Sequence, residues 1–188
     1  MMELANRAIV FAAEAHDGMR RKQADIPYIL HPMEAAAIVG TITGNQNVIA
    51  AAALHDVVED TDITMSRIEE CFGKRVAELV ASETEDKMTP LPAESTWKKR
   101  KAEAIRLLSE TNDRDVKILY LGDKLANLRA VYLVWRERGQ EVWQDFNQKD
   151  PTQQAWYYRS IAESIRELSD TAAWQEFDGL IRTIFAEV

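Results

Sequence analysis

Six consecutive residues combine metal-ligand types with paired carboxylates. Positions 55–60 read His-Asp-Val-Val-Glu-Asp, at the end of an apolar segment. On a helix, Glu59 lies four positions after His55 and Asp60 four after Asp56, so the second acidic pair lies one turn further along the same face. His55 and Asp56 can bind one metal ion, while Glu59 and Asp60 can handle a water molecule or a leaving group. The pattern indicates metal-dependent hydrolysis, and its alternative is an acidic, solvated helix end.

Further ligands must come from other segments, because a catalytic metal site needs about three protein ligands and an open position. His31 directly precedes Pro32, which suits the first turn of a helix. Asp123 lies in a long apolar helix, where a lone carboxylate requires a cation, a salt bridge or a raised pKa. Lys124 and Arg129 are alternative structural partners, so the residues alone leave a metal ligand and a buried ion pair equally open.

Length and charge limit the class of protein. The chain has 188 residues and a net charge of −8. Its length suits one sizeable core, so we expect a single domain over residues 1–188. The acidic balance disfavours a nucleic-acid partner, since such proteins normally present a basic surface. A phosphate-bearing ligand would therefore meet a local basic cluster.

Cysteine usage and hydropathy bear on location. Cys71 is the only cysteine, and no basic, apolar leader opens the sequence. Both features predict a reducing, cytoplasmic environment. The longest apolar run covers residues 48–54, far short of the roughly 20 residues that span a bilayer. We therefore expect a soluble protein without a membrane partner.

The spacing of apolar residues predicts helices throughout. Expected helices cover residues 3–16, 32–39, 48–56, 65–72, 76–85, 97–110, 113–133, 151–168 and 171–187. Asn45 or Asn47 can cap the central apolar helix, and Ser95 or Thr96 the one that opens at residue 97. No strand pattern appears, so the prediction is an all-α bundle of roughly eight to ten helices.

Two basic stretches, at residues 19–27 and 98–101, and one proline-rich loop stand out against the acidic composition. Residues 19–27 form a polar, basic loop without periodicity, and residues 87–94 contain two prolines and form the expected mobile loop. The basic run at residues 98–101 lies at the expected start of a helix, where positive charge opposes the helix dipole. That placement favours a functional explanation, and a solvated face is the alternative.

The order of these motifs resembles that of the HD-domain phosphohydrolases: His31-Pro32, then the run at 55–60, then Asp123-Lys124 with Asn127. More narrowly, the phrases at residues 16–22, 27–32, 53–61 and 84–87 resemble the hydrolase domain of the RelA/SpoT family. The similarity covers most of the chain and is clearest from residue 10 to about 130. The length resembles that of the stand-alone small alarmone hydrolases.

The resemblance implies a ligand set and a catalytic pair. The metal ligands would be His31, His55, Asp56 and Asp123, holding one ion that is commonly manganese. Glu59 and Asp60 correspond to the catalytic acidic pair of the family. The ligand types themselves permit Mn(II), Zn(II), Fe(II) or Co(II).

The resemblance also implies substrate contacts. Phosphate groups would be bound by Arg20, Arg21, Lys22 and Lys87, which are otherwise solvated charges. Further contacts are expected from Tyr28, Asn127 and Tyr157, although the two tyrosines can equally be packing and Asn127 a satisfied polar residue. Met19 and the loop at 87–94 depart from the family pattern, which leaves the fine choice of substrate open.

The resemblance implies a Mn(II)-dependent enzyme that removes the 3′-pyrophosphate of the guanosine alarmones ppGpp and pppGpp, leaving GDP or GTP. One alternative is a nucleotide phosphomonoesterase or NADPH 2′-phosphatase with the same site. Another is a metal-bearing nucleotide sensor, which the Glu59-Asp60 pair argues against. The tryptophans at positions 135, 143, 156 and 174 are predicted to lie in the core or at a subunit contact, which allows a homo-oligomer.

Overall fold

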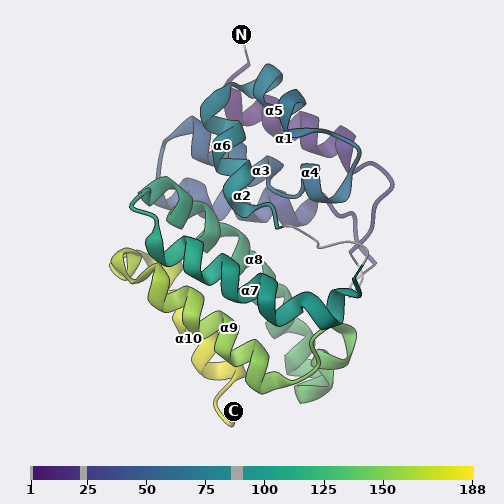
Figure 1. The fold of residues 1–188 in the computed structure, drawn as a ribbon, viewed down its shortest axis with the longest axis vertical. Helices are drawn as coiled ribbons and strands as arrows, with labels where there is room; N and C mark the ends of the chain where they lie inside the picture. The colour runs from purple at the N-terminus through teal and green to yellow at the C-terminus, as the bar shows by residue number, and fades with distance from the viewer. Residues whose placement is uncertain (1, 22–24, 86–90) are drawn as a thin grey trace. The chain divides into compact units, whose positions relative to one another are not determined.

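The secondary structure is helical throughout the described part of the chain. The structure is a computed structural model that describes residues 2–21, 25–85 and 91–188. Within these ranges it contains ten α-helices and two 3₁₀ helices and no β-strand (Figure 1). The predicted all-α fold is confirmed. None of the described helices is both long enough and apolar enough to cross a membrane. The cytoplasmic location stays a prediction.

Contacts between residues group the chain into two compact units. The first unit contains residues 1–84 and 113–126, and the second contains residues 85–112 and 127–188. The long helix α8 (Arg114–Arg138) therefore contributes its first half to one unit and its second half to the other. The single domain expected over residues 1–188 stays a prediction.

The first unit is built around the buried helix α3. Its helices are α1 (Leu4–Ala15), α2 (Leu30–Ile42), α3 (Gln46–Leu54), α4 (Val57–Asp60), α5 (Met65–Phe72), α6 (Lys74–Glu83) and the first half of α8. Helix α3 packs against α1, α2 and α6. Its four consecutive alanines are almost fully buried, and these small side chains permit close packing on several sides. The Asn45 side chain caps α3 by accepting from the Asn47 N–H at 3.0 Å, as predicted.

Helix α3 ends at Leu54, directly before the predicted metal ligand His55. Residues 55 and 56 form a turn and α4 follows, so the expected helix over residues 48–56 ends two residues early, and the helical spacing assumed from His55 to Asp60 is interrupted by this turn. The reason lies in the side chain of His55, whose Nδ1 bonds the Ala52 carbonyl oxygen at 2.8 Å. In a continuous helix that carbonyl would accept from the N–H of Asp56, so the imidazole competes with the backbone.

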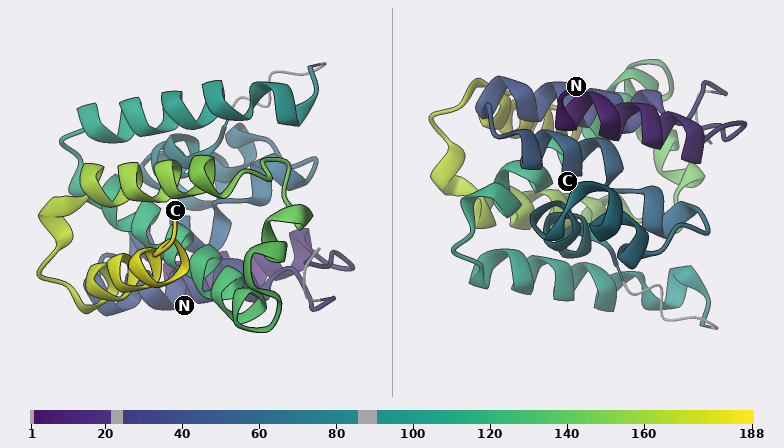
Figure 2. Two further views of the ribbon diagram at one scale, coloured as in Figure 1. Left: turned by 90° about the horizontal axis from the view of Figure 1, so that it is seen from below. Right: turned by 90° about the horizontal axis from the view of Figure 1, so that it is seen from above.

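The second unit packs α9 between two other helices. Its elements are α7 (Ala93–Glu110), the second half of α8, η1 (Gly139–Asp145), α9 (Pro151–Ser164), η2 (Arg166–Leu168) and α10 (Ala172–Ile184). Helix α9 contacts both α7 and α10 (Figure 2). The Trp143 ring stacks on Phe185 with centroids 5.2 Å apart, and both side chains are fully buried. The prediction that Trp143 lies in the core is confirmed. The predicted helix over 151–168 is interrupted after Ser164.

Helix α7 begins earlier than predicted, at Ala93, so Ser95 and Thr96 are not its caps. The basic run therefore lies beyond the first turn of the helix, where its conflict with the helix dipole is smaller. Arg100 and Lys101 both form ion pairs with Glu85. Lys98 donates to the side chain of Gln153 and lies 3.4 Å from the centroid of the Trp156 ring. These contacts give three of the four charges a structural role within the second unit.

Candidate metal centre

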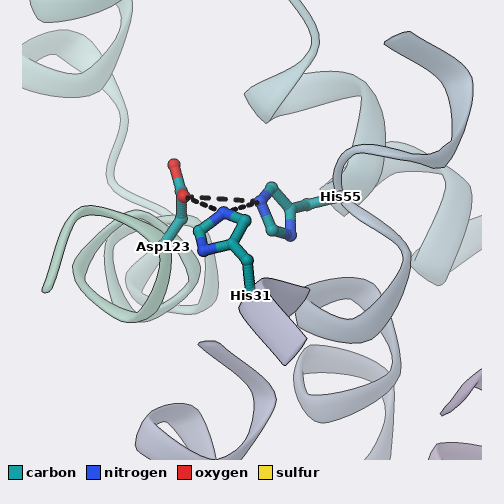
Figure 3. Close-up of side chains that lie close together, drawn as sticks. All are labelled: His31, His55 and Asp123. Carbon is teal, nitrogen blue, oxygen red and sulfur yellow. Dashed lines mark hydrogen bonds and ion pairs between the residues drawn. The ribbon is translucent and has the colours of Figure 1, made fainter. Parts of the chain in front are cut away.

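Four side chains of the first unit bring their donor atoms together. We call His31, His55, Asp56 and Asp123 the donor cluster. His31 Nε2 lies 3.2 Å from His55 Nε2 and 3.1 Å from Asp123 Oδ1 (Figure 3). His55 Nε2 lies 3.2 Å from Asp56 Oδ2 and 3.4 Å from Asp123 Oδ1. His31 Nε2 and Asp56 Oδ2 are 3.5 Å apart, so all four predicted ligands meet at one place.

Three separate segments supply the donor cluster. His31 lies in the first turn of α2, His55 and Asp56 form the turn after α3, and Asp123 lies in α8. The close approach of α8 to α2 depends on Gly122. A Cβ atom at this position would lie 2.6 Å from Val39 Cγ2 and 3.0 Å from the Ala35 carbonyl oxygen. The role of Gly122 was not predicted from the sequence, although a glycine inside an apolar helix is itself an indication of close packing.

The spacing of the donor atoms fits one divalent ion. Nitrogen and oxygen ligands bind Zn²⁺ at about 2.0–2.2 Å, which separates neighbouring ligand atoms in a tetrahedral site by about 3.3–3.6 Å. The five separations that involve an imidazole nitrogen run from 3.1 to 3.5 Å. The Nδ1–H of His55 faces the Ala52 carbonyl, so the Nε2 lone pair faces the other ligands. His31 Nδ1 is buried without a hydrogen-bond partner among the described residues.

The carboxylates of the donor cluster favour a protonated His55 when no ion is bound. Burial lowers the pKa of His55, but the carboxylates of Asp56 and Asp123 outweigh it and raise the pKa well above its ordinary value. Burial raises the pKa of both carboxyls, but neighbouring cationic groups hold each pKa well below its ordinary value. These groups are the two imidazoles for Asp56, and Lys124 with the imidazoles for Asp123. A divalent ion can replace these protons, since it binds the neutral imidazole and the carboxylate.

Tyr28 extends the donor cluster toward the acidic pair. Its hydroxyl donates to Asp56 Oδ2 at 2.7 Å. Burial, and then the negative charges of Asp56 and Asp60, raise the pKa of this hydroxyl well above its ordinary value. The tyrosine therefore stays protonated and remains a donor to Asp56. Glu59 and Asp60 lie on α4, where Glu59 is half-buried and Asp60 is exposed. Their catalytic role stays a prediction.

His16 lies beside Tyr28, close to the donor cluster, and this position was not predicted from the sequence. Its imidazole is 2% exposed, lies 4.9 Å from the Tyr28 ring between centroids, and places Nδ1 3.4 Å from Met19 Sδ. Burial lowers its pKa, although Asp56 and Asp60 oppose that shift. Only its place in the motif at residues 16–22 could have identified it.

The predicted phosphate-binding residues have different surroundings. Arg21 places its guanidinium carbon 5.9 Å from the centroid of the Tyr28 ring. Arg20 instead pairs with Asp25, with Nε 2.9 Å from Oδ1. Lys22 and Lys87 lie outside the described residues, and their roles stay predictions.

The other two predicted contact residues belong to the second unit. Asn127 lies on α8, and Tyr157 lies on α9. Tyr157 is 4% exposed, its ring lies 4.9 Å from Lys101 Nζ, and its hydroxyl is buried without a partner among the described residues. Their substrate contacts stay predictions.

Comparison with known families assigns the chain to a class. The HD domain family matches residues 8–152, so the chain belongs to the HD-domain family. HD domains are metal-dependent, and His31, His55 and Asp123 form a group that could hold the ion. The resemblance drawn from the sequence motifs is confirmed at this level.

Within the HD-domain family, the chain is similar to curated proteins that are named as alarmone pyrophosphohydrolases. The chain is 36% identical over 138 residues to a probable guanosine-3′,5′-bis(diphosphate) 3′-pyrophosphohydrolase of Synechocystis, covering 72% of this chain and 18% of the relative. It is 34% identical over 140 residues to the guanosine-3′,5′-bis(diphosphate) 3′-pyrophosphohydrolase of Aquifex aeolicus, covering 74% and 19% of the two chains. The chain thus spans about a fifth of the length of these relatives.

Two solved structures share the fold over most of their length. One is described as a metazoan ortholog of SpoT that hydrolyzes ppGpp, and it matches with a TM-score of 0.77 and 26% identity, covering 97% of this chain and 96% of that one. The other, lmo0812 from Listeria monocytogenes, matches with a TM-score of 0.73 and 32% identity, covering 84% and 99% of the two chains. The resemblance to RelA/SpoT hydrolases is thereby confirmed.

Proposed function

We propose that this chain is an enzyme that hydrolyses the 3′-pyrophosphate group of guanosine alarmones. The products from ppGpp would be GDP and pyrophosphate, and from pppGpp they would be GTP and pyrophosphate. The observation that carries the proposal is the convergence of the donor cluster within an HD domain. The named activity of the curated relatives and of the metazoan structure supports this choice of substrate.

His31, His55, Asp56 and Asp123 would hold the ion, and we propose that it is Mn(II). Two imidazoles and two carboxylates form a borderline-to-hard ligand set, which suits manganese and also accepts zinc, iron or cobalt. When bound, a divalent ion lowers the pKa of a water ligand and polarises phosphoryl oxygens. The hydrogen bond from Tyr28 to Asp56 holds that carboxylate in its orientation.

The acidic pair would manage protons during the reaction. Glu59 or Asp60 accepts a proton from the attacking water, and the same groups can return it to the departing ribose oxygen. Attack at the phosphorus attached to the 3′-oxygen breaks the bond between them. The water oxygen then stays with the pyrophosphate, and the ribose leaves with its 3′-hydroxyl restored.

Positive side chains would hold the substrate phosphates. Arg21 lies beside the Tyr28 ring, and its guanidinium can bind phosphate oxygens in pairs. We assign the same role to Arg20, Lys22 and Lys87 from the family resemblance, and contacts to the nucleoside to Tyr28, Asn127 and Tyr157. The partner is then a small molecule in the cytoplasm, and assembly into a homo-oligomer stays a prediction.

A product analysis tests the proposal. The purified protein would be incubated with ppGpp, pppGpp, NADPH and nucleoside monophosphates, each with Mn(II), Zn(II) or Mg(II). The proposal predicts pyrophosphate from the first two substrates only. Orthophosphate from NADPH or from the monophosphates would instead identify a phosphomonoesterase. Tight binding of ppGpp without turnover, with the ion bound, would identify a sensor.

A further inference from the structure

A buried lysine connects the donor cluster to a glutamate outside it. Lys124 Nζ contacts the second carboxylate oxygen of Asp123, Oδ2, which is not the oxygen that faces the imidazoles. The same Nζ lies 3.2 Å from Glu83 Oε2, at the end of α6. The side chains of Lys124, Asp123 and Glu83 are 12%, 5% and 3% exposed. The three side chains thus form one row that is nearly shielded from solvent. Burial raises the pKa of Glu83 to about 7, and the charge of Lys124 opposes that shift.

Aromatic packing and a second hydrogen bond keep this row in place. Lys124 Nζ lies 5.2 Å from the centroid of the Tyr120 ring, one turn earlier on α8. The Tyr120 hydroxyl donates to the Ser82 carbonyl oxygen at 3.1 Å, directly before Glu83. Helices α6 and α8 are therefore joined both by the ion pair of Lys124 with Glu83 and by this hydrogen bond. The position of Nζ is set by the protein and not by solvent.

Glu83 is an unusual residue to bury at this position. Its Oε1 is buried without a hydrogen-bond partner among the described residues, so the desolvation of this carboxyl is only partly compensated. A side chain that served packing alone would be expected to be apolar. The unfavourable burial is explained if the negative charge is needed beside Lys124.

We propose that Glu83 is a positioning residue for the metal ligand Asp123 and acts on it through Lys124. This inference rests on the metal centre of the proposed function. Lys124 holds Asp123 Oδ2, which leaves Oδ1 directed at the imidazoles. A lysine without a counter-ion would compete with a divalent ion for Asp123 and would repel that ion through the weakly screened interior. Glu83 offsets the lysine charge, so that Asp123 can be oriented by Lys124 and still bind the ion.

Metal affinity tests this role directly. Wild type and Glu83→Gln would be compared by Zn(II) competition against a fluorescent chelator, and Co(II) absorption would report on the ligand geometry. Removing a group that supports a ligand costs about 10–100-fold in metal affinity, and we expect a loss of that order in Glu83→Gln. The matched control is Asp113→Asn, which removes an ion-paired carboxylate of the same unit and should leave the affinity within about twofold.

A second pair of variants tests whether Glu83 acts through the lysine. In a Lys124→Met background, Glu83→Gln should produce no further change in affinity, because the charge that Glu83 offsets is gone. This pair also serves if Glu83→Gln alone does not fold, since neither variant contains an uncompensated buried lysine. An equal loss in both backgrounds would overturn the proposal.

Failure of the metal centre and failure of the role of Glu83 give different results in these experiments. If wild type binds no divalent ion, the metal centre of the proposed function fails and this inference fails with it. If wild type binds the ion and Glu83→Gln binds it equally well, only the role of Glu83 is overturned. A loss of affinity with an unchanged melting temperature of the metal-free protein supports the positioning role over a merely structural one.

Discussion

Two polar clusters of the first unit both join segments that are distant in the sequence, but in only one of them does a permanently charged side chain lie between the two carboxylates. The arginine cluster consists of Arg75, Asn45, Asp113 and Asp115. Arg75 donates to both carboxylates of this cluster at 2.7–2.8 Å, and Asn45 donates to Asp115 at 3.2 Å. In the donor cluster, atoms that all bear lone pairs face one another at similar distances. Such atoms require protons or an added cation between them.

Exposure and charge separate the two clusters further. The side chains of Arg75 and Asp113 are 36% and 35% exposed, whereas those of His31 and His55 are 4% and 2% exposed. In the arginine cluster, Arg75 lowers the pKa of Asp113, and the pair is complete as a salt bridge. In the donor cluster, burial lowers the pKa of His55, but the carboxylates of Asp56 and Asp123 raise it above its ordinary value. Deeper burial and the lack of a permanently charged side chain between the facing donor atoms therefore distinguish the donor cluster from the arginine cluster.

The largest effect should come from removing a donor atom. We expect Asp123→Ala to lose metal by more than about 100-fold in affinity, beyond the usual cost of removing a group that only supports a ligand. Turnover of ppGpp should be lost with the ion. Metal content of the purified variant, measured by elemental analysis, checks this expectation. Full metal content in Asp123→Ala would show that the predicted set of metal ligands is wrong.

Replacement of the acidic pair should separate binding from turnover. Neither Glu59 nor Asp60 belongs to the donor cluster, so Glu59→Gln and Asp60→Asn should keep the metal and the fold. The loss of a proton acceptor should lower kcat by about 10²–10⁴-fold for Glu59→Gln and by a comparable or smaller factor for Asp60→Asn. Single-turnover kinetics with metal-loaded protein would measure this. Near wild-type turnover in Glu59→Gln would move the proton transfer to Asp60 or to the substrate.

Arg21 should affect substrate affinity and leave the metal in place. A hydrogen bond to a charged group contributes about 1.5–3 kcal/mol, so Arg21→Ala should raise KM for ppGpp by about 10–100-fold with little change in kcat. The dependence of KM on salt concentration should also become weaker. Arg20→Ala should raise KM by a smaller factor, because Arg20 already pairs with Asp25. Equal KM values for Arg21→Ala and wild type would make the basic loop a solvated surface.

The smallest effect is expected in the arginine cluster. Asp113→Asn should lower the free energy of unfolding by about 0.2–1 kcal/mol, the range for partly exposed ion pairs, without changing metal affinity. Arg75 holds the pKa of Asp113 below its ordinary value, so the contribution is present above about pH 4 and is lost as pH falls through the folded-state pKa. Urea unfolding of both proteins at several pH values tests this. A difference that grew on acidification would contradict the sign.

The sequence was sufficient for the helical class, because apolar spacing is a local property. The residues of the donor cluster were predicted as a set only through the family resemblance, since the residues alone left Asp123 open between a metal ligand and a buried ion pair. Prediction from the sequence failed where a side chain competes with the backbone: the bond from His55 to the Ala52 carbonyl ends a helix that periodicity alone continues. It also failed for Glu83 and Gly122. Their significance depends on which helix packs opposite them, and periodicity does not encode that.

The most direct test of the proposed activity is a single turnover of ppGpp in ¹⁸O-labelled water with Mn(II)-loaded protein, followed by mass spectrometry of the products. The account predicts one ¹⁸O atom in pyrophosphate and unlabelled GDP, because water attacks the phosphorus attached to the 3′-oxygen. Release of orthophosphate, label in the nucleotide, or absence of turnover with the ion bound would contradict it.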